Sequence, residues 1–290
     1  MTSSRLNKGK VIKLNLPDSK MTAAEYLSHF YSMPKQQIKL PLADEDYVKQ
    51  WQKYSGQNVL EFLKEEFQIE TDKYNFQEQT RITLTFTGTM GGNLPVVFTS
   101  NHEDFVVMEA LLNGRDNLRE LPLTVNAFTI PARNEKIYRH RIILLNEAPY
   151  SNVSADKLGL KVDEWLKKSY KLRLRHESAH YETLRLFGGM KNHALDEIIA
   201  DALGQIAAFG NFNAARQRLF FGLHGDKCDG RLQFYCQKVL EDERHLVYEA
   251  VDKALDIVEE KIREALSENL SERNILYMLA GQSIEQLIGA

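Results

Sequence analysis

Two histidines and a glutamate, in the stretch Leu172–His180, are the residues of this chain whose types and spacing best suit chemistry. The stretch has a helical pattern, so His176 and His180 project from one face, one turn apart. Two neutral imidazoles at that separation can bind one Zn²⁺, and Glu177 is placed to take a proton from a metal-bound water. The same H-E-x-x-H pattern also occurs by chance on surface helices with two unrelated histidines. Support from elsewhere in the chain must decide between these interpretations.

A second acidic pattern, E-x-x-x-D, follows shortly after the glycine pair at 188–189. A catalytic zinc wants three protein ligands and one open position, and a carboxylate is a normal third ligand. Glu197 is the predicted third ligand. Asp201, one turn further on, is predicted to accept the free ring N–H of a ligating histidine. The rest of this helix is mostly apolar, so its carboxylates are predicted to be buried, and a metal with its histidines is a sufficient partner for them.

Together these patterns resemble those of the gluzincins, the thermolysin and neprilysin type of zinc metallopeptidase, in which H-E-x-x-H is followed on a second helix by E-x-x-x-D. Upstream, Asn126-Ala127-Phe128 is similar to the N-A-F stretch that lines the substrate cleft of those peptidases on an edge strand. The resemblance implies that the Asn126 side chain and the Ala127 backbone hold a peptide substrate in extended form beside the zinc. It covers residues 125–201, and Thr129 stands where an aromatic residue is usual.

Peptide hydrolysis also needs a hydrogen-bond donor for the oxyanion that forms at the carbonyl group. The resemblance implies a downstream His or Tyr for this role, and an arginine that holds the substrate backbone. His224 and Arg231 are the candidate catalytic pair, because they share one glycine-containing loop after the glutamate helix. His193 and Tyr181 remain alternatives.

The hydrophobic pattern predicts the elements that position these residues. Ahead of the metal motifs it predicts helices at 21–32, 43–54, 56–68 and 102–113, and extended segments at 11–14, 81–87, 94–98, around 126 and at 136–145. A helix capped by Ser154 is predicted to begin near Ala155. From residue 190 onward the chain is predicted to be almost wholly helical, with a short helix at 214–221, a long amphipathic helix over 232–266 and a last helix from Ser271 to Gly289.

These elements predict an α+β fold of zincin-like type, with a small mixed sheet followed by a mostly helical C-terminal half that carries the metal-site helices. The predicted organisation is an N-terminal helical segment over 1–75, a catalytic core over 76–210 and a C-terminal helical region over 211–290. The long C-terminal helix serves packing in this interpretation, and it could also support a homodimer.

Composition favours a soluble globular protein of 290 residues, 43% hydrophobic and 27% charged, with a net charge of −3. No basic block is present, so there is no electrostatic case for nucleic acid as a partner. Residues 1–10 lack an apolar secretion signal, and no run approaches the length of a membrane span. Cys228 and Cys236 are predicted to be free thiols, which suits a reducing cytoplasm.

The sequence therefore predicts a cytoplasmic zinc metallopeptidase that acts on a peptide or small amide, with Glu177 as general base. Two alternatives stay open: a zinc hydrolase of a non-peptide amide or ester, and a non-catalytic binding protein built on the same scaffold. Metal content separates the last alternative from the other two interpretations.

Overall fold

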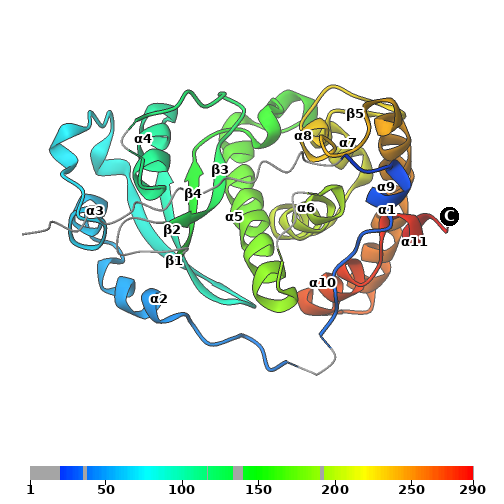
Figure 1. Cartoon of the computed structure of the whole chain (residues 1–290), viewed down its shortest axis with the longest axis horizontal. Coiled ribbons are helices and arrows are strands. Elements are labelled where there is room, and N and C mark those ends of the chain that lie inside the picture. The colour runs from blue at the N-terminus through cyan, green and yellow to red at the C-terminus, as the bar shows by residue number, and fades with distance from the viewer. Residues whose placement is uncertain (1–19, 35–37, 116, 133–139, 190–192, 290) are drawn as a thin grey trace, which may run out of the picture.

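The structure is a computed structural model that describes residues 20–34, 38–115, 117–132, 140–189 and 193–289 (Figure 1). The fold is mixed α/β, with a small mixed sheet in the first half of the chain and helices in most of the second half. This agrees with the predicted combination of sheet and helices. The extended segment predicted at 11–14 and the start of the strand predicted at 136–145 lie outside the described residues. Within them, no helix is both long and apolar enough to cross a membrane.

The sheet has four strands in the order β1-β2-β4-β3. Their bounds are Thr83–Thr89 for β1, Gly92–Thr99 for β2, Ala127–Ala132 for β3 and His140–Asn146 for β4. β1 and β2 form an antiparallel hairpin, β2 and β4 are parallel, and β3 is antiparallel to β4. β3 is thus an edge strand, as expected for the strand that carries Ala127 and Phe128. Among the residues described, no strand pairs with its outer side.

Helices cover both faces of this sheet. They are α4 (His102–Leu112) on one face and α5 (Val162–Phe187) on the other. Successive side chains of a strand point to opposite faces, so Ile142 and Leu144 of β4 pack in the cluster that includes α4 residues, whereas Ile143 and Leu145 pack with residues of α5. β4 is therefore buried on both sides, and α5 packs against the sheet through Tyr170, Leu174 and Tyr181.

α5 begins at Val162, so the prediction of a helix starting near Ala155 is wrong. Ala155–Leu158 forms a short 3₁₀ turn, which ends at Gly159 in the left-handed conformation with φ of 65°. A glycine at such a position terminates helical structure at little steric cost. From Val162 the helix runs unbroken for 26 residues and carries the whole H-E-x-x-H stretch.

α6 (Ala194–Phe209) packs against α5 more extensively than any other helix does among the described elements. The contact is close because α6 presents Gly204 to α5. A Cβ atom at this position would meet the backbone oxygen of Leu172 at 2.8 Å, which real Cβ atoms essentially never do. The absence of a side chain at Gly204 therefore allows the two helices to approach closely.

The C-terminal region contains α7 (Ala214–Phe221), a hairpin of β5 (Leu223–His224) and β6 (Lys227–Cys228), α8 (Leu232–Tyr235), α9 (Arg244–Ser267), α10 (Glu272–Ala280) and α11 (Ile284–Ile288). The prediction of one helix over 232–266 is wrong, because the chain between α8 and α9 leaves the helical path in a turn, and there Val239 forms a β-bridge with Met21. The predicted last helix is two helices, since Ser283 caps a second start after Gly281. Cys228 and Cys236 are free thiols, as predicted.

The segments upstream of the sheet contact opposite ends of the molecule. α2 (Asp46–Trp51) and α3 (Val59–Phe67) pack on the α4 side of the sheet, where Trp51 forms aromatic contacts with Phe62 and Phe67. α1 (Ala23–Leu27) lies instead against α9 and α11 (Figure 1). The helix predicted over 21–32 stops at Leu27, because contacts with the C-terminal helices replace helical hydrogen bonds. For example, the Tyr31 backbone N–H donates to the Ala280 carbonyl at 3.3 Å.

Candidate metal centre

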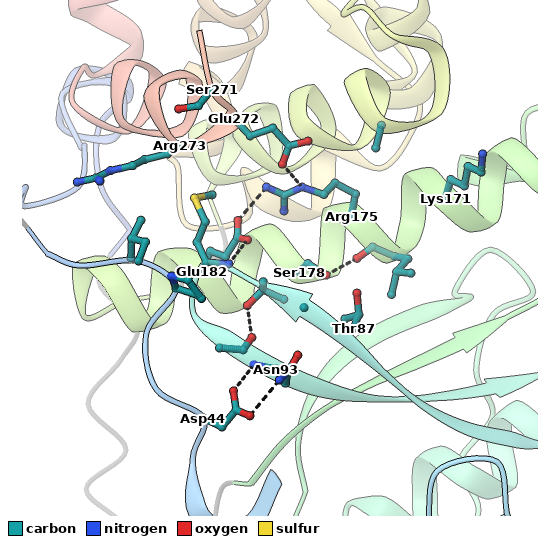
Figure 2. Close-up of a pocket in the computed structure, with 18 residues that line it drawn as sticks. Asp44, Thr87, Asn93, Lys171, Arg175, Ser178, Glu182, Ser271, Glu272 and Arg273 are labelled. Atoms are coloured by element: carbon teal, nitrogen blue, oxygen red, sulfur yellow. Dashed lines mark hydrogen bonds and ion pairs between the residues drawn. The ribbon is translucent and has the colours of Figure 1, made fainter. Parts of the chain in front are cut away.

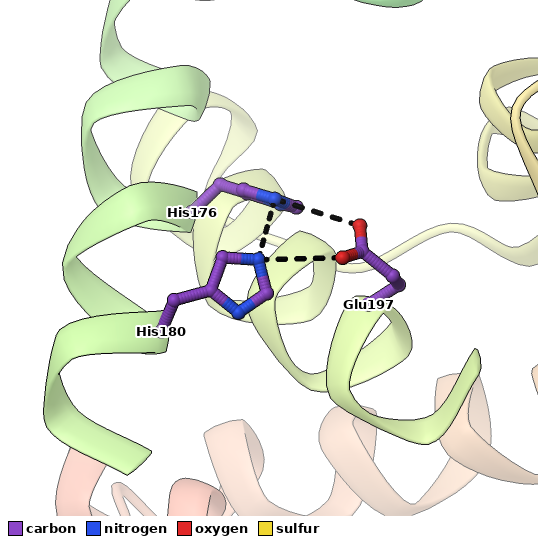
Figure 3. A group of neighbouring side chains, drawn as sticks. All are labelled: His176, His180 and Glu197. Carbon is purple, nitrogen blue, oxygen red and sulfur yellow. Dashed lines mark hydrogen bonds and ion pairs between the residues drawn. The ribbon is translucent and has the colours of Figure 1, made fainter. Parts of the chain in front are cut away.

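Three side chains from α5 and α6 converge on one point (Figure 3). The Nε2 atoms of His176 and His180 lie 3.0 Å apart. The Glu197 carboxylate lies 3.6 Å from Nε2 of His176 and 3.4 Å from Nε2 of His180. Two ligands ~2.0–2.1 Å from a tetrahedral Zn²⁺ are roughly 3.3 Å apart, so these separations suit one ion with an open fourth position. All three residues are buried, and together they form a group that could hold a metal ion.

The charges of this group also fit a cation. With the ring hydrogens on the Nδ1 atoms, which face carboxylates, the two Nε2 atoms direct lone pairs at each other and need a proton or a metal ion between them. Burial by itself lowers the pKa of His180, but the Asp196 and Glu197 carboxylates outweigh it and hold that pKa well above its ordinary value. Burial also opposes ionisation of Glu197, yet His180, His176 and Arg231 lower the pKa of its carboxyl far below the usual range. Glu197 is therefore ionised at neutral pH, as a metal ligand must be.

Asp201, the predicted partner of a ligating histidine, contacts the ring of His176. Nδ1 of His176 lies 2.8 Å from the Asp201 carboxylate and 3.1 Å from the Tyr150 hydroxyl, and that hydroxyl donates to the same carboxylate. Asp201 is fully buried, and its second oxygen accepts hydrogen bonds from Gln217 and Arg231. Burial raises the pKa of Asp201, but Arg231 and His176 more than offset it and keep the pKa low. Asp201 can thus hold the His176 ring with Nε2 toward the ligand group.

His180 has an equivalent partner that the sequence did not identify for this role. Its Nδ1 lies 3.1 Å from Oδ2 of Asp196, an ion-pair contact outside the angular range of a hydrogen bond. The other Asp196 oxygen accepts from the Tyr31 hydroxyl. Asp196 directly precedes Glu197, so its place beside the ligand could have suggested the role. Tyr31 is 165 residues away, and no local spacing could have pointed to it.

The candidate base, Glu177, is held by the edge strand. The Thr129 hydroxyl donates to Oε2 of Glu177 at 2.7 Å, and both residues are buried. Oε1 has no hydrogen-bond partner among the residues that the structure describes. Thr129, which stands where an aromatic residue is usual, therefore has a structural role here. Its hydroxyl fixes one oxygen of the Glu177 carboxylate and leaves the other available.

The structure does not support a substrate-binding role for the Asn126 side chain. Its oxygen accepts from Nδ2 of Asn146 at 2.8 Å, and its own Nδ2 donates to the Leu123 carbonyl at 2.8 Å. The residue is 5% exposed. These contacts hold the chain just before β3 and occupy both polar atoms of the Asn126 amide inside the protein. Ala127 keeps its predicted place, since it is the first residue of the edge strand.

The two members of the predicted catalytic pair lie in different surroundings. His224 is at the tip of the β5–β6 hairpin, with its side chain 65% exposed and Nε2 3.4 Å from the Asp229 carboxylate. The hairpin turns it toward solvent, and none of its described contacts is with the ligand group. Arg231 does reach the group, because one of its Nη atoms donates to Glu197 at 2.9 Å and the other to Asp201. Its contacts hold the carboxylates of α6 in place.

Another hydroxyl lies beside Arg231. The Tyr235 hydroxyl accepts from Nη1 of Arg231 at 3.4 Å and interacts with Glu197. Burial, and then the charge of Glu197, raise the pKa of Tyr235 well above its usual value, so it stays a hydrogen-bond donor at neutral pH. The alternatives from the sequence have other tasks. His193 caps α6 through Nδ1, and the Tyr181 hydroxyl bonds to Glu45.

A cavity of about 860 Å³ lies on the other side of α5, between the β1–β2 hairpin and the start of α10 (Figure 2). Arg175 crosses it and pairs with Glu182 at 2.9 Å and Glu272 at 3.1 Å. On a helix, the positions of Arg175, Ser178 and Glu182 face away from those of the two ligand histidines. The cavity is therefore separate from the ligand group.

A mixed α/β fold with a buried group of two histidines and one glutamate defines the class of this protein as a candidate metalloprotein. The chain belongs to DUF7005, a family of unknown function, whose model matches residues 124–289. That range contains the three candidate ligands, Thr129, Arg231 and Tyr235, but not Tyr31. Comparisons with curated proteins and with solved structures find no match.

Proposed function

We propose that this protein is a zinc metallopeptidase of gluzincin type. The observation that carries the proposal is the convergence of His176, His180 and Glu197 at separations that suit tetrahedral Zn²⁺, with a carboxylate behind each ring. A bound Zn²⁺ would supply a Lewis acid that polarises a carbonyl group and makes a coordinated water acidic. The two-histidine, one-glutamate donor set is that of catalytic zinc sites, which keep an open position, and differs from the cysteine-rich sets of structural ones.

The chain's own residues then have distinct tasks. Glu177 accepts the proton of the attacking water, at the oxygen that Thr129 leaves unpaired, and passes it to the leaving nitrogen. Arg231 keeps Glu197 and Asp201 in place. Tyr235 replaces His224 as the proposed donor to the oxyanion, because its hydroxyl lies beside Arg231 and Glu197 and stays protonated. The outer side of β3 can add an extended peptide as one more strand through backbone hydrogen bonds.

Metal analysis is the primary test. Chain purified without added metal, then dialysed against Zn²⁺ and freed of excess, should hold about one Zn²⁺ per molecule, and His180→Gln should hold much less. Failure of the wild-type chain to bind Zn²⁺ would reject the proposal. A screen of the zinc-loaded chain on quenched peptide libraries and on small amides and esters tests the substrate class. Cleavage of amides or esters alone favours a non-peptide hydrolase, and no cleavage of any favours a binding protein.

A further inference from the structure

The segment at residues 20–34 contacts the first turn of α6, which carries Asp196 and the ligand Glu197. The Tyr26 hydroxyl accepts the backbone N–H of Ala194 at 2.7 Å, and the Tyr26 carbonyl accepts from Nε2 of His193 at 2.8 Å. The rings of Tyr26 and His193 also stack, with centroids 3.8 Å apart. A segment that is distant in sequence thus satisfies part of the N-terminus of the helix that bears a ligand.

These contacts affect what Asp196 can do. The first N–H groups of a helix lack partners inside the helix, and an acidic side chain at the third position often turns back to satisfy one. Here the Tyr26 hydroxyl accepts the Ala194 N–H, and His193 Nδ1 accepts the Leu195 N–H, so these two groups have partners other than Asp196. Asp196 faces His180 instead.

Tyr31 completes the arrangement. Its hydroxyl donates to Oδ1 of Asp196, while Oδ2 lies 3.1 Å from Nδ1 of His180. Each ligand histidine is thus backed by a carboxylate of α6 and a tyrosine from another part of the chain, and Tyr150 has this position behind His176. Asp196 is 2% exposed. If the Tyr31 hydroxyl were removed, bulk water could not replace it as the hydrogen-bond donor to Asp196 without rearrangement.

Backbone contacts hold the segment in place. The Met21 N–H donates to the Lys238 carbonyl at 2.9 Å, and the Leu240 N–H donates to the Met21 carbonyl at 3.0 Å. The Ala23 N–H donates to the Glu243 carboxylate at 2.7 Å. The segment therefore has its own attachment to the C-terminal region, independent of the hydroxyl of Tyr31.

We propose that residues 20–34 are part of the metal centre, with Tyr31 as a positioning residue that acts on His180 through Asp196. The proposal rests on metal binding by the ligand group and adds a contribution from outside the stretch that matches the family. The tyrosine hydroxyl restrains the carboxylate, and the carboxylate restrains the ring, so that Nε2 of His180 is aimed at the ion before it binds.

Tyr31→Phe tests this proposal, because it removes one hydroxyl and keeps the ring. The Kd for Zn²⁺, measured by competition with a chromophoric chelator, should rise about 10-fold, at the low end of the effect of losing an outer partner of a ligand. The visible spectrum of the Co²⁺-loaded chain should also change, since ring orientation alters the ligand field. Tyr54→Phe is the matched control, because its hydroxyl also bonds to carboxylates, Glu65 and Glu66, but in the α3 region.

A double-mutant cycle tests the route through Asp196. Asp196→Asn should weaken Zn²⁺ binding, and adding Tyr31→Phe to it should change the Kd by less than twofold. The reason is that the effects of two substitutions are not additive when one residue acts through the other. Full additivity would contradict the proposed route. A Tyr31→Phe chain with the Kd and Co²⁺ spectrum of the Tyr54→Phe chain would overturn this inference alone, whereas a wild-type chain that binds no Zn²⁺ would overturn the proposed function with it.

Discussion

At the scale of single residues, the two glutamates near the histidines should have separable roles. Glu177→Gln keeps size and removes basicity, so it should keep bound Zn²⁺ and lose about 10²–10⁴-fold in kcat. Glu197→Gln removes a charged ligand, so it should lose Zn²⁺ affinity by more than the ~10–100-fold that the loss of an outer partner costs. Elemental analysis and single-substrate kinetics on both variants check this. Loss of metal from Glu177→Gln, or retention of metal and activity by Glu197→Gln, would show that base and ligand are wrongly assigned.

The hydroxyl of Thr129 gives a second prediction at this scale. Thr129→Val keeps the shape of the side chain and removes the hydrogen bond to Glu177, so the base should lose its fixed orientation. We expect kcat to fall about 10-fold, which corresponds to ~1.4 kcal/mol of transition-state stabilisation, with Zn²⁺ content unchanged. Thr129→Ser restores a hydroxyl and should restore most of the rate. Equal rates for the Val and Ser variants would show that the hydrogen bond has no role in turnover.

The raised pKa of His180 predicts a pH dependence of stability in the metal-free chain. Burial lowers this pKa, but the charges of Asp196 and Glu197 prevail and raise it above 6.5. A group with a raised folded pKa contributes stability that is complete below its unfolded pKa and is lost as pH rises through the folded value. The Tm of the metal-free chain should thus fall as pH is raised above ~6.5, and bound Zn²⁺ should remove this fall, because the ion replaces the proton.

Thermal denaturation followed by circular dichroism, with and without Zn²⁺, measures the effect. His180→Gln should lose the pH dependence in the metal-free state, and His224→Gln, at an exposed histidine, should keep it. Zn²⁺ affinity should rise with pH over the same range, because the proton on His180 must leave before the ion binds. A wild-type Tm that matches that of His180→Gln at every pH would contradict the assignment.

At the scale of elements, the close contact of α5 with α6 sets the separation of the ligands. In a helix that is free to adjust, Gly→Ala gains about 1 kcal/mol. At Gly204 the added methyl group would meet the Leu172 carbonyl, and overpacking of this kind costs ~1–3 kcal/mol. Gly204→Ala should therefore lower the free energy of unfolding or leave it unchanged, and should weaken Zn²⁺ binding as the helices separate.

Ala207→Gly, at an exposed position of the same helix, is the control, because it reports helix propensity alone. Urea denaturation gives the free energies of unfolding, and chelator competition gives the affinities. The opposite result is a Gly204→Ala chain that is about 1 kcal/mol more stable than wild type, as helix propensity predicts, with unchanged Zn²⁺ affinity. That result would show that the contact between α5 and α6 can accommodate a methyl group.

The elements also show what sequence could and could not predict. The sequence could predict the grouping of His176, His180 and Glu197, because helical geometry is regular and each pattern lies within a single helix. The break between α8 and α9 was missed, and the β-bridge from Met21 to Val239 that forms there is a long-range contact which no local pattern records. Likewise, exposure of His224 follows from a hairpin of two-residue strands, which is too short to give an alternating pattern.

At the scale of the whole molecule, α5 lies between the sheet and the helical half of the chain. It packs on the sheet face opposite α2, α3 and α4, and on its other side it contributes to the hydrophobic core formed by α6, α1 and the C-terminal helices. The candidate base is restrained from the sheet side by Thr129, and the carboxylate ligand from the helical side by Arg231. The proposed catalytic group is therefore assembled from both halves, although its three ligands come from only two consecutive helices.

The attachment of residues 20–34 to the far end of the chain has a consequence for biosynthesis. Tyr31 meets a partner 165 residues later, and Ala23 meets one 220 residues later. On a ribosome, the early segment must wait, undocked, until Glu243 has been translated and released from the exit tunnel. Contacts of such long range also form late in refolding. We expect the Co²⁺ absorption band to reach its final form no earlier than the slowest phase of refolding followed by circular dichroism, so that a newly made chain gains its full metal affinity only after nearly all of it has been synthesised.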